Sequence, residues 1–395
     1  MYTIIHGDCL EELKKLDDNS VDAVITDPPY GLSNTKPAQV ADVLAAWVTG
    51  DTVSVPAKRG GFMGADWDSF VPPPAVWGEC MRVLKPGGHM AVFAGARTQD
   101  LMGLSIRLAG FEIRDTLGWI YGSGFPKSMD VSKAIDKAAP ATLAAKRWEG
   151  WGTALKPAIE PIILARKPLD GTVASNVLAH GVGGLNIDAS RVGTSGGGTH
   201  CNNRDADGKC LGHKGGSAWD TFHGDESSAG RFPANVLLDE HAAKEMDEQS
   251  GWQKDGTAVR RNRKNSEANP NGIYSSHVRE AEPDQTFGSG GGASRFFPVF
   301  KYQAKAPKKE RPVIEREDGS KIQHPTVKPL ALMEWLVTLI TPEGGTVLDP
   351  FAGTGTTLQA ATNKGFHPIG IEADADYIQL IHQRLEGGTP STRSS

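Results

Sequence analysis

The sequence predicts an α/β fold in which a mostly parallel sheet carries helices on both faces and is interrupted by a polar insertion. Two short apolar segments, Val21–Thr26 and 346–348, lie near opposite ends of the chain, and each runs straight into a turn, as buried strands do. Between them, residues 171–294 are dominated in places by glycine, serine and asparagine. A length of 395 residues suits one large domain with such an insertion.

The other elements follow from apolar periodicity and from capping residues. Strands are predicted at 2–5, 21–26, 89–94, 112–121, 159–165, 235–238, 346–348 and 365–372. Helices are predicted at 8–16, with Asp8 as the N-cap, and at 239–249, 329–340, 358–361 and 376–385. Residues 299–303 alternate in polarity and fit a half-buried strand. We expect a long loop at 31–71 and a disordered tail at 387–395.

The most informative stretch is Asp27-Pro28-Pro29-Tyr30, which directly follows the strand Val21–Thr26. The carboxyl edge of an open α/β sheet is where ligands bind. Because both prolines lack an N–H, this turn offers a carboxylate, free carbonyl oxygens and an aromatic ring. Together these groups suit a planar ligand with an NH2 group, such as a nucleobase. The alternative is an ordinary strand-to-turn junction with an aromatic plug.

A second motif, residues 346–357, is a strand followed by a glycine turn and a helix, and it includes Asp349, Phe351, Gly353 and Gly355. Its glycines allow a ligand to approach the backbone, and the helix N-terminus offers free N–H groups. It is neither a phosphate loop nor the dinucleotide fingerprint, since the lysine and the third glycine are missing.

Glu372 ends the next predicted strand, at a position suited to binding the two hydroxyls of a ribose. A ligand with a ribose and a carboxylate but no pyrophosphate fits this pair of features, and S-adenosylmethionine is such a ligand. A nucleotide-binding unit of another purpose is the alternative.

Together the two motifs resemble the paired signatures of the S-adenosylmethionine-dependent DNA amino-methyltransferases, which modify adenine N6 or cytosine N4. The catalytic motif comes first and the cofactor motif last, as in the group called beta. Residues 324–329 (His-Pro-Thr-Val-Lys-Pro) and the loop expected at 84–88 are further matches. The resemblance covers about the first third and the last fifth of the chain. It implies a class I methyltransferase sheet of the Rossmann-like type with an inserted target-recognition region.

The resemblance also implies roles for the matching residues. Asp27, Pro28, Pro29 and Tyr30 are then the catalytic residues. The cofactor-binding residues are Asp8, Cys9, Thr326, Lys328, Asp349, Phe351, Gly353, Gly355, Thr356 and Glu372. The substrate implied is double-stranded DNA, with adenine N6 favoured because cytosine-N4 enzymes more often carry serine in place of Asp27. An RNA or protein-amide methyltransferase and a non-catalytic DNA-binding regulator remain as alternatives, as does cytosine N4.

The predicted division of the chain is a first catalytic part at 1–170, a target-recognition insertion at 171–310, a cofactor-binding part at 311–386 and the tail. A net charge of −5 makes DNA contacts depend on local basic groups. The candidates are Lys58, Arg59, Arg260, Arg261, Arg263 and Lys264. A homodimer suits a palindromic target.

Cysteine usage and hydropathy indicate the compartment. Four cysteines without a disulfide framework favour a reducing cytoplasm, bacterial or of a phage host. No apolar run is long enough to suggest a membrane span. His200, Cys201, Cys210 and His213 are close in sequence, but their spacing does not match a zinc frame, so no metal is predicted.

Overall fold

The structure is a computed structural model. It describes residues 2–33, 35–56, 68–122, 124, 128–138, 143–192, 230–254, 258–260, 285–287, 290–300, 312–316, 318–319, 321–323 and 327–386. The chain forms two compact units. The first unit comprises Met1–Ser190, Ala234–Ala242 and Pro298–Ser395, and the second comprises Arg191–Pro233 and Ala243–Phe297.

The first unit is built on a nine-stranded sheet with the order β1-β15-β14-β2-β3-β5-β4-β6-β11. Its strands are β1 (Thr3–His6), β2 (Val21–Thr26), β3 (Leu84–Phe93), β4 (Glu112–Ile120), β5 (Ile159–Arg166), β6 (Val236–Asp239), β11 (Val299–Phe300), β14 (Thr346–Asp349) and β15 (His367–Glu372). All neighbouring strands are parallel except β5, which is antiparallel to both β3 and β4. The predicted mostly parallel α/β sheet is confirmed.

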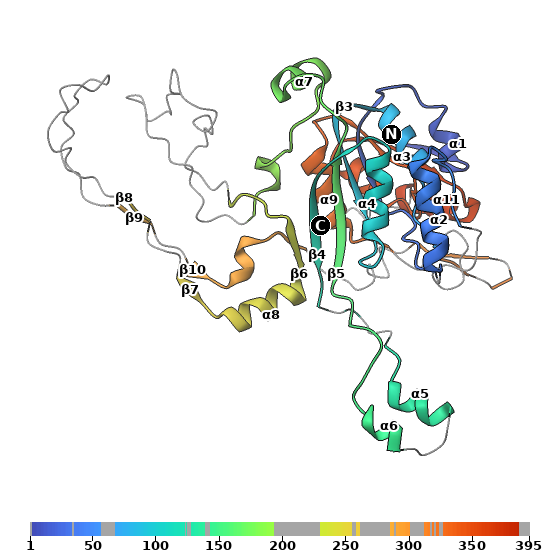
Figure 1. Cartoon of the computed structure of the whole chain (residues 1–395). Helices are drawn as coiled ribbons and strands as arrows, with labels where there is room; N and C mark the ends of the chain where they lie inside the picture. Colours follow the sequence, from blue (N-terminus) through green and yellow to red (C-terminus); the bar gives the residue numbers. More distant parts are fainter. Residues whose placement is uncertain are drawn as a thin grey trace, which may run out of the picture. The chain divides into compact units, whose positions relative to one another are not determined.

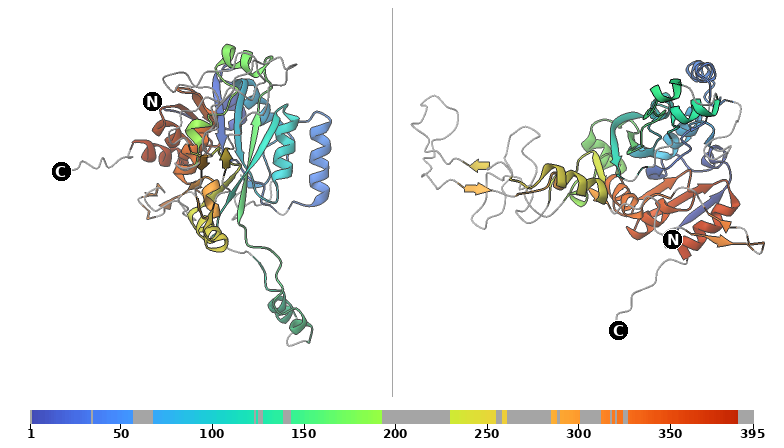
Figure 2. Two further views of the ribbon diagram at one scale, coloured as in Figure 1. Left: turned by 90° about the vertical axis from the view of Figure 1, so that its left-hand side faces the viewer. Right: turned by 90° about the horizontal axis from the view of Figure 1, so that it is seen from below.

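Helices cover both faces of this sheet. On one face the core includes α1 (Cys9–Leu13), α2 (Pro37–Val48), α3 (Pro74–Val83) and α4 (Gln99–Leu108), and on the other it includes α9 (Leu330–Ile340) and α10 (Thr356–Asn363). The other helices of the structure are α5 (Val131–Ala138), α6 (Leu143–Arg147), α7 (Val173–His180), α8 (Glu240–Ser250) and α11 (Ala375–Glu386). Figure 1 labels most of them, and the left view of Figure 2 shows the blue and cyan helices on one side of the strands and the red helices on the other.

The alternation of side chains along β2 explains the two layers. Val24 packs into a core shared with α1, α2, α3 and α4, whereas Ala23 and Ile25 pack into a second core with α9 and α10. A strand that is buried on both faces reads as a continuous apolar run, which is the pattern that predicted β2.

Three local expectations are corrected by the structure. The loop expected at 31–71 contains α2, because Val43 and Trp47 lie one turn apart and bury one face of a helix. The loop expected at 84–88 is a bulge within β3, which pairs with β2 at Leu84 and again from His89. The first helix ends at Leu13 instead of residue 16, although its predicted cap is confirmed, with Asp8 Oδ1 accepting from the backbone N–H of Leu10.

The second unit contains short two-stranded pairs. β7 (Gln253–Lys254) pairs with β10 (Gly290–Gly291), and β8 (Ala258–Arg260) pairs with β9 (Gln285–Phe287). In the first unit, β12 (Ile314–Glu315) pairs with β13 (Lys321–Ile322). The range 171–310 that we predicted as an insertion therefore also holds β6 and β11, which are strands of the main sheet. The tail at 387–395 lies outside the described residues.

Within the described ranges, none of the helices combines the length and the apolar composition that a bilayer-spanning segment needs.

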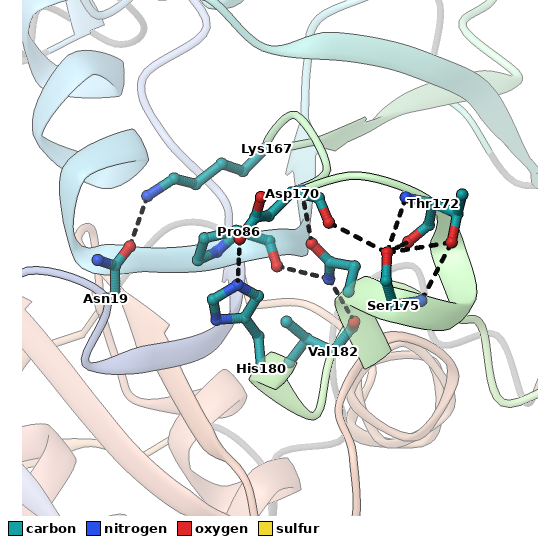
Figure 3. Close-up of polar contacts among 9 residues, drawn as sticks. Asn19, Pro86, Lys167, Asp170, Thr172, Ser175, His180 and Val182 are labelled. Carbon is teal, nitrogen blue, oxygen red and sulfur yellow. Dashed lines mark hydrogen bonds and ion pairs between the residues drawn. The ribbon is translucent and has the colours of Figure 1, made fainter. Parts of the chain in front are cut away.

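A buried asparagine, Asn176, connects α7 to the bulge of β3 by hydrogen bonds. Figure 3 labels Pro86, Asp170 and Val182, which are its backbone partners. Asn176 is fully buried, and its Nδ2 donates to the carbonyls of Pro86 and Val182 at 2.9 and 2.8 Å. Its Oδ1 accepts from the backbone N–H of Asp170 at 2.8 Å. Gly87, with φ of +77°, is required here, because a Cβ would lie 2.3 Å from Asn176 Nδ2.

We expect Asn176→Ala to lower the free energy of unfolding by about 2–4 kcal/mol, because it leaves one buried and two partly buried backbone groups without their partners. Leu178→Ala on the same helix is the control, since Leu178 is 88% exposed. Urea unfolding of both variants beside the wild type measures the difference. Equal losses for the two variants would contradict the structural role of Asn176.

Candidate functional site

The two sequence motifs meet because β2 and β14 are parallel neighbours in the sheet. Leu348 pairs with Val24, so the residues that follow both strands emerge at the same edge. A buried hydrogen bond of 2.7 Å from Thr26 Oγ1 to Asp349 Oδ1 joins the two strand ends. Beside them lies a cavity of about 920 Å³, and both motifs line it.

The turn that carries Tyr30 is fixed by its neighbours on both sides. The backbone N–H groups of Tyr30 and Gly31 donate to Asp68 Oδ1 at 2.6 and 3.0 Å. The carbonyl of Tyr30 accepts from Thr98 Oγ1 at 2.6 Å. Gly31 has φ of +68°, and a Cβ there would lie 2.8 Å from the backbone nitrogen of Val71. The turn after β2 is therefore held rigidly at the cavity wall.

Four polar side chains converge next to this turn. Tyr30 Oη lies 2.7 Å from Asp27 Oδ1 and 2.5 Å from Glu160 Oε1. Lys328 Nζ lies 2.9 Å from Tyr30 Oη, 2.9 Å from Glu160 Oε1 and 3.1 Å from Asp27 Oδ2. We call Asp27, Tyr30, Glu160 and Lys328 the polar cluster. It draws on β2, β5 and the segment before α9.

Burial and charge set the protonation of this cluster. Burial alone would lower the pKa of Lys328, but the carboxylates of Asp27 and Glu160 outweigh it and raise that pKa above its usual value. Lys328 is thus a permanent cation. Burial, together with the same two carboxylates, also raises the pKa of Tyr30 well above 10, so its hydroxyl keeps its proton at neutral pH.

The opposite part of the cavity is formed by the ends of β14 and β15. Glu372 Oε2 accepts from the backbone N–H of Gly353 at 2.7 Å, and its Oε1 accepts from that of Asp374 at 2.9 Å. These bonds point the Glu372 carboxylate along the glycine turn. Burial, the larger influence, raises the pKa of Glu372 in spite of the two N–H donors.

Asp349 is 3% exposed, and burial raises its pKa to about 6. Hydrogen bonds from Thr357, Thr26 and the backbone N–H of Phe351 oppose this rise. A buried carboxylate with such a pKa, ionised at neutral pH, favours a cationic ligand beside it.

Asp8 and Cys9 also line the cavity, at the end of β1. Asp8 is the cap of α1, as predicted from its position. Burial, helped by Asp8, raises the pKa of the Cys9 thiol to about 12, so Cys9 stays protonated and is not an activated nucleophile.

Most of the predicted site residues are thus brought to one cavity. Its lining includes Asp8, Cys9, Asp27, Pro28, Pro29, Tyr30, Lys328, Asp349, Phe351, Gly353, Thr356 and Glu372. Gly355 is not part of the lining; it is the N-cap of α10, with φ of +75°. Thr326, Lys58, Arg59, Arg261, Arg263 and Lys264 lie outside the described residues, and Arg260 is the last residue of β8 in the second unit.

Sequence reasoning missed Glu160 and Asp68. Glu160 is the second residue of the apolar strand β5, and a single acid near a strand end gives no signal of its own. Asp68 is 3% exposed, and a buried aspartate follows no local pattern. Among the described residues no group of three or more His, Cys, Asp and Glu side chains could hold a metal ion, and the His200–His213 set lies outside them.

Comparison with known proteins identifies the family of the chain. The model of the N6/N4 methyltransferase family, described as DNA methylase, matches residues 21–383. The chain is 25% identical to the type II methyltransferase M.HindIII of Haemophilus influenzae over 97% of this chain and 94% of that protein.

Two solved structures align with nearly the whole chain. One is the M1.HpyAVI–SAM complex, with 16% identity, a TM-score of 0.42 and coverage of 98% of this chain and 99% of that one. The other is the cytosine-N4-specific PvuII DNA methyltransferase, with 15% identity, a TM-score of 0.45 and coverage of 100% and 90%. Because the family model matches most of the chain, the chain belongs to the N6/N4 DNA methylase family of S-adenosylmethionine-dependent DNA methyltransferases.

Proposed function

We propose that this protein transfers the methyl group of S-adenosylmethionine to N6 of an adenine that is flipped out of double-stranded DNA at a short target sequence. The observation that carries the proposal is the single cavity in which the Asp27 carboxylate lies beside the ends of β14 and β15. A donor and an acceptor bound there need no covalent enzyme intermediate, and catalysis rests on positioning and electrostatics.

The donor side fits the cofactor by its chemistry. S-adenosylmethionine supplies a methyl group on a cationic sulfonium, and it also carries a ribose and an amino-acid end. Glu372 would bind the ribose hydroxyls. Asp349 provides a buried negative charge suited to the cation, and the glycine turn at Gly353 gives the ligand room beside the backbone. Asp8 and Cys9, which follow the carboxyl end of β1, would meet the adenine ring of the cofactor.

The acceptor side fits an exocyclic amino group. The target atom is inaccessible in a stacked duplex, so the base has to leave the helix at a cost of about a few kcal/mol. Asp27 and the Pro28 carbonyl would accept hydrogen bonds from the NH2 group and favour the tetrahedral nitrogen that attack requires. The Tyr30 ring would stack on the extruded base and recover part of the cost.

Adenine is favoured over cytosine by the residue at position 27. Cytosine-N4 enzymes of the resembling family more often carry serine there. Asp27 has two carboxylate oxygens: Oδ1 lies 2.7 Å from Tyr30 Oη, Oδ2 lies 3.1 Å from Lys328 Nζ, and the residue lines the cavity. Methylation of cytosine N4 would use the same residues and is the alternative.

Target recognition and assembly are further parts of the proposal. The insertion at 171–310 would read the sequence, with Lys58, Arg59 and the basic residues at 260–264 neutralising phosphates. We propose a homodimer, acting on DNA in the bacterial cytoplasm, since paired subunits suit a palindromic target.

Sequencing of DNA from cells that express the wild-type chain or Asp27→Ala tests the reaction and the base together. We expect N6-methyladenine at one short sequence in the wild-type sample alone. The purified variant should still bind S-adenosylmethionine, because Asp27 lies on the acceptor side. N4-methylcytosine in place of N6-methyladenine would show that cytosine, not adenine, is the methylated base. Equal methylation by the variant would contradict the catalytic role of Asp27.

Cofactor affinity is expected to depend on pH through Asp349. Its pKa of about 6 lies above the ordinary value for aspartate, and a bound sulfonium favours the ionised form. Affinity for S-adenosylmethionine should therefore rise as pH increases through about 6, and Asn in place of Asp349 should flatten this rise. Isothermal titration between pH 5 and 8 measures it; a parallel rise in Asp349→Asn would assign the dependence to another group.

A further inference from the structure

Glu160 carries a role that neither sequence motif supplies. It is the second residue of β5, its side chain is 16% exposed, and it lies against Tyr30 and Lys328 in the polar cluster. The methyl-transfer reaction proposed above uses Asp27 and Tyr30 but leaves unexplained why a second carboxylate is buried beside them. The inference below rests on that proposed function and deepens it.

The polar cluster has one hydrogen fewer than its short oxygen–oxygen contacts require. Tyr30 Oη makes two short oxygen–oxygen contacts, 2.7 Å to Asp27 and 2.5 Å to Glu160, but it has a single hydroxyl hydrogen. Lys328 does not fill the gap, because its three hydrogens are directed to Tyr30 Oη, Glu160 Oε1 and Asp27 Oδ2. Both contacts become hydrogen bonds only when the cluster gains one more proton.

The net charge of the cluster also indicates that one proton is missing. Counted by formal charge, two carboxylates and one ammonium give the cluster one net negative charge, and all three side chains are partly buried. Burial disfavours an uncompensated charge, so one added proton brings the cluster to neutrality. The amino group of the base loses one proton when it gains the methyl group.

We propose that Glu160 is the proton acceptor of methyl transfer, reached from Asp27 through the hydroxyl of Tyr30. As the nitrogen–methyl bond forms and the carbon–sulfur bond of the donor breaks, one N–H bond of the amino group breaks and its proton passes to Asp27 Oδ1. Asp27 passes a proton to Tyr30 Oη, and the original hydroxyl hydrogen of Tyr30 passes to Glu160 Oε1. Asp27 ends as a carboxylate, Tyr30 as a phenol and Glu160 as a carboxylic acid, which loses its proton to water after product release.

Lys328 keeps its positive charge throughout this relay. Its ammonium contacts both carboxylates and the oxygen of Tyr30, so it stabilises whichever of them is negative during the transfer. Lys328 cannot itself accept the proton, because it stays protonated throughout.

The test uses Glu160→Gln and Tyr30→Phe, alone and together, in single-turnover transfer of labelled methyl from S-adenosylmethionine to target DNA. Glutamine keeps an acceptor oxygen for Lys328 and Tyr30 but does not take up a proton at neutral pH. Because a positioned proton acceptor contributes on the order of 10²-fold or more, we expect each single variant to lose about 10- to 100-fold in rate. Cofactor affinity should stay within about threefold of the wild type in all variants, which also reports that they fold.

Three results distinguish a proton relay from a purely structural role of Glu160 and Tyr30. The double variant should be no slower than the slower single variant, because both substitutions interrupt one path. The wild type should react more slowly in D2O than in H2O, and this difference should shrink in both single variants. Glu112→Gln is the matched control, since Glu112 lies at the opposite end of the same pair of strands, opposite Arg166, and should keep the wild-type rate.

A wild-type rate in Glu160→Gln or in Tyr30→Phe would overturn the relay, as would losses that multiply in the double variant. These outcomes differ from a failure of the proposed function. If the wild type labels cytosine, the base is wrong while the same variants still decide the relay. If the wild type labels no DNA at all, the proposed function falls, and the relay falls with it.

Discussion

The ammonium group of Lys328 is the interaction on which the candidate site depends. It lies between the carboxylates of Asp27 and Glu160 at 3.1 and 2.9 Å, and its side chain is 10% exposed. Asp27 follows β2, Glu160 lies in β5 and Lys328 itself precedes α9, so this cation joins three distant parts of the sequence. Two carboxylates at this depth would repel each other without it, and Lys328 would be a costly buried charge without them.

The sheet order makes this arrangement possible. Because β14 lies next to β2, strands from opposite ends of the chain are neighbours, and the residues that follow their carboxyl ends line one cavity. The antiparallel β5 then brings its amino end, with Glu160, to the same edge. The site is therefore divided by charge. Asp349 and Glu372 form a negative side suited to a cationic donor, and the polar cluster with its fixed cation forms the other side.

Elements with a local signature were predictable from the sequence, and contacts made over long range were not. The apolar runs of β2, β5 and β14 and the cap at Asp8 predicted these elements, and the two motifs located Asp27, Asp349 and Glu372. Helix α2 was missed because only its tertiary burial against Phe70 distinguishes it from a loop. Glu160 and Asp68 were missed because each acts on a residue far away along the chain. Lys328 was identified, but its pairing with Asp27 was not, since no pattern encodes a contact across 300 residues.

The measurement that tests the central claim most directly is the free energy of unfolding of Lys328→Met beside Lys328→Met/Glu160→Gln. Removing the cation leaves two partly buried carboxylates unpaired, so the single variant should lose about 2–3 kcal/mol, between the costs for exposed and fully buried pairs, and neutralising Glu160 should restore part of it. Lys364→Met removes a cation that pairs with Glu334 nearer the surface and should cost no more than about 1 kcal/mol. Equal stability of Lys328→Met and the wild type would contradict the account, and so would a double variant less stable than the single one.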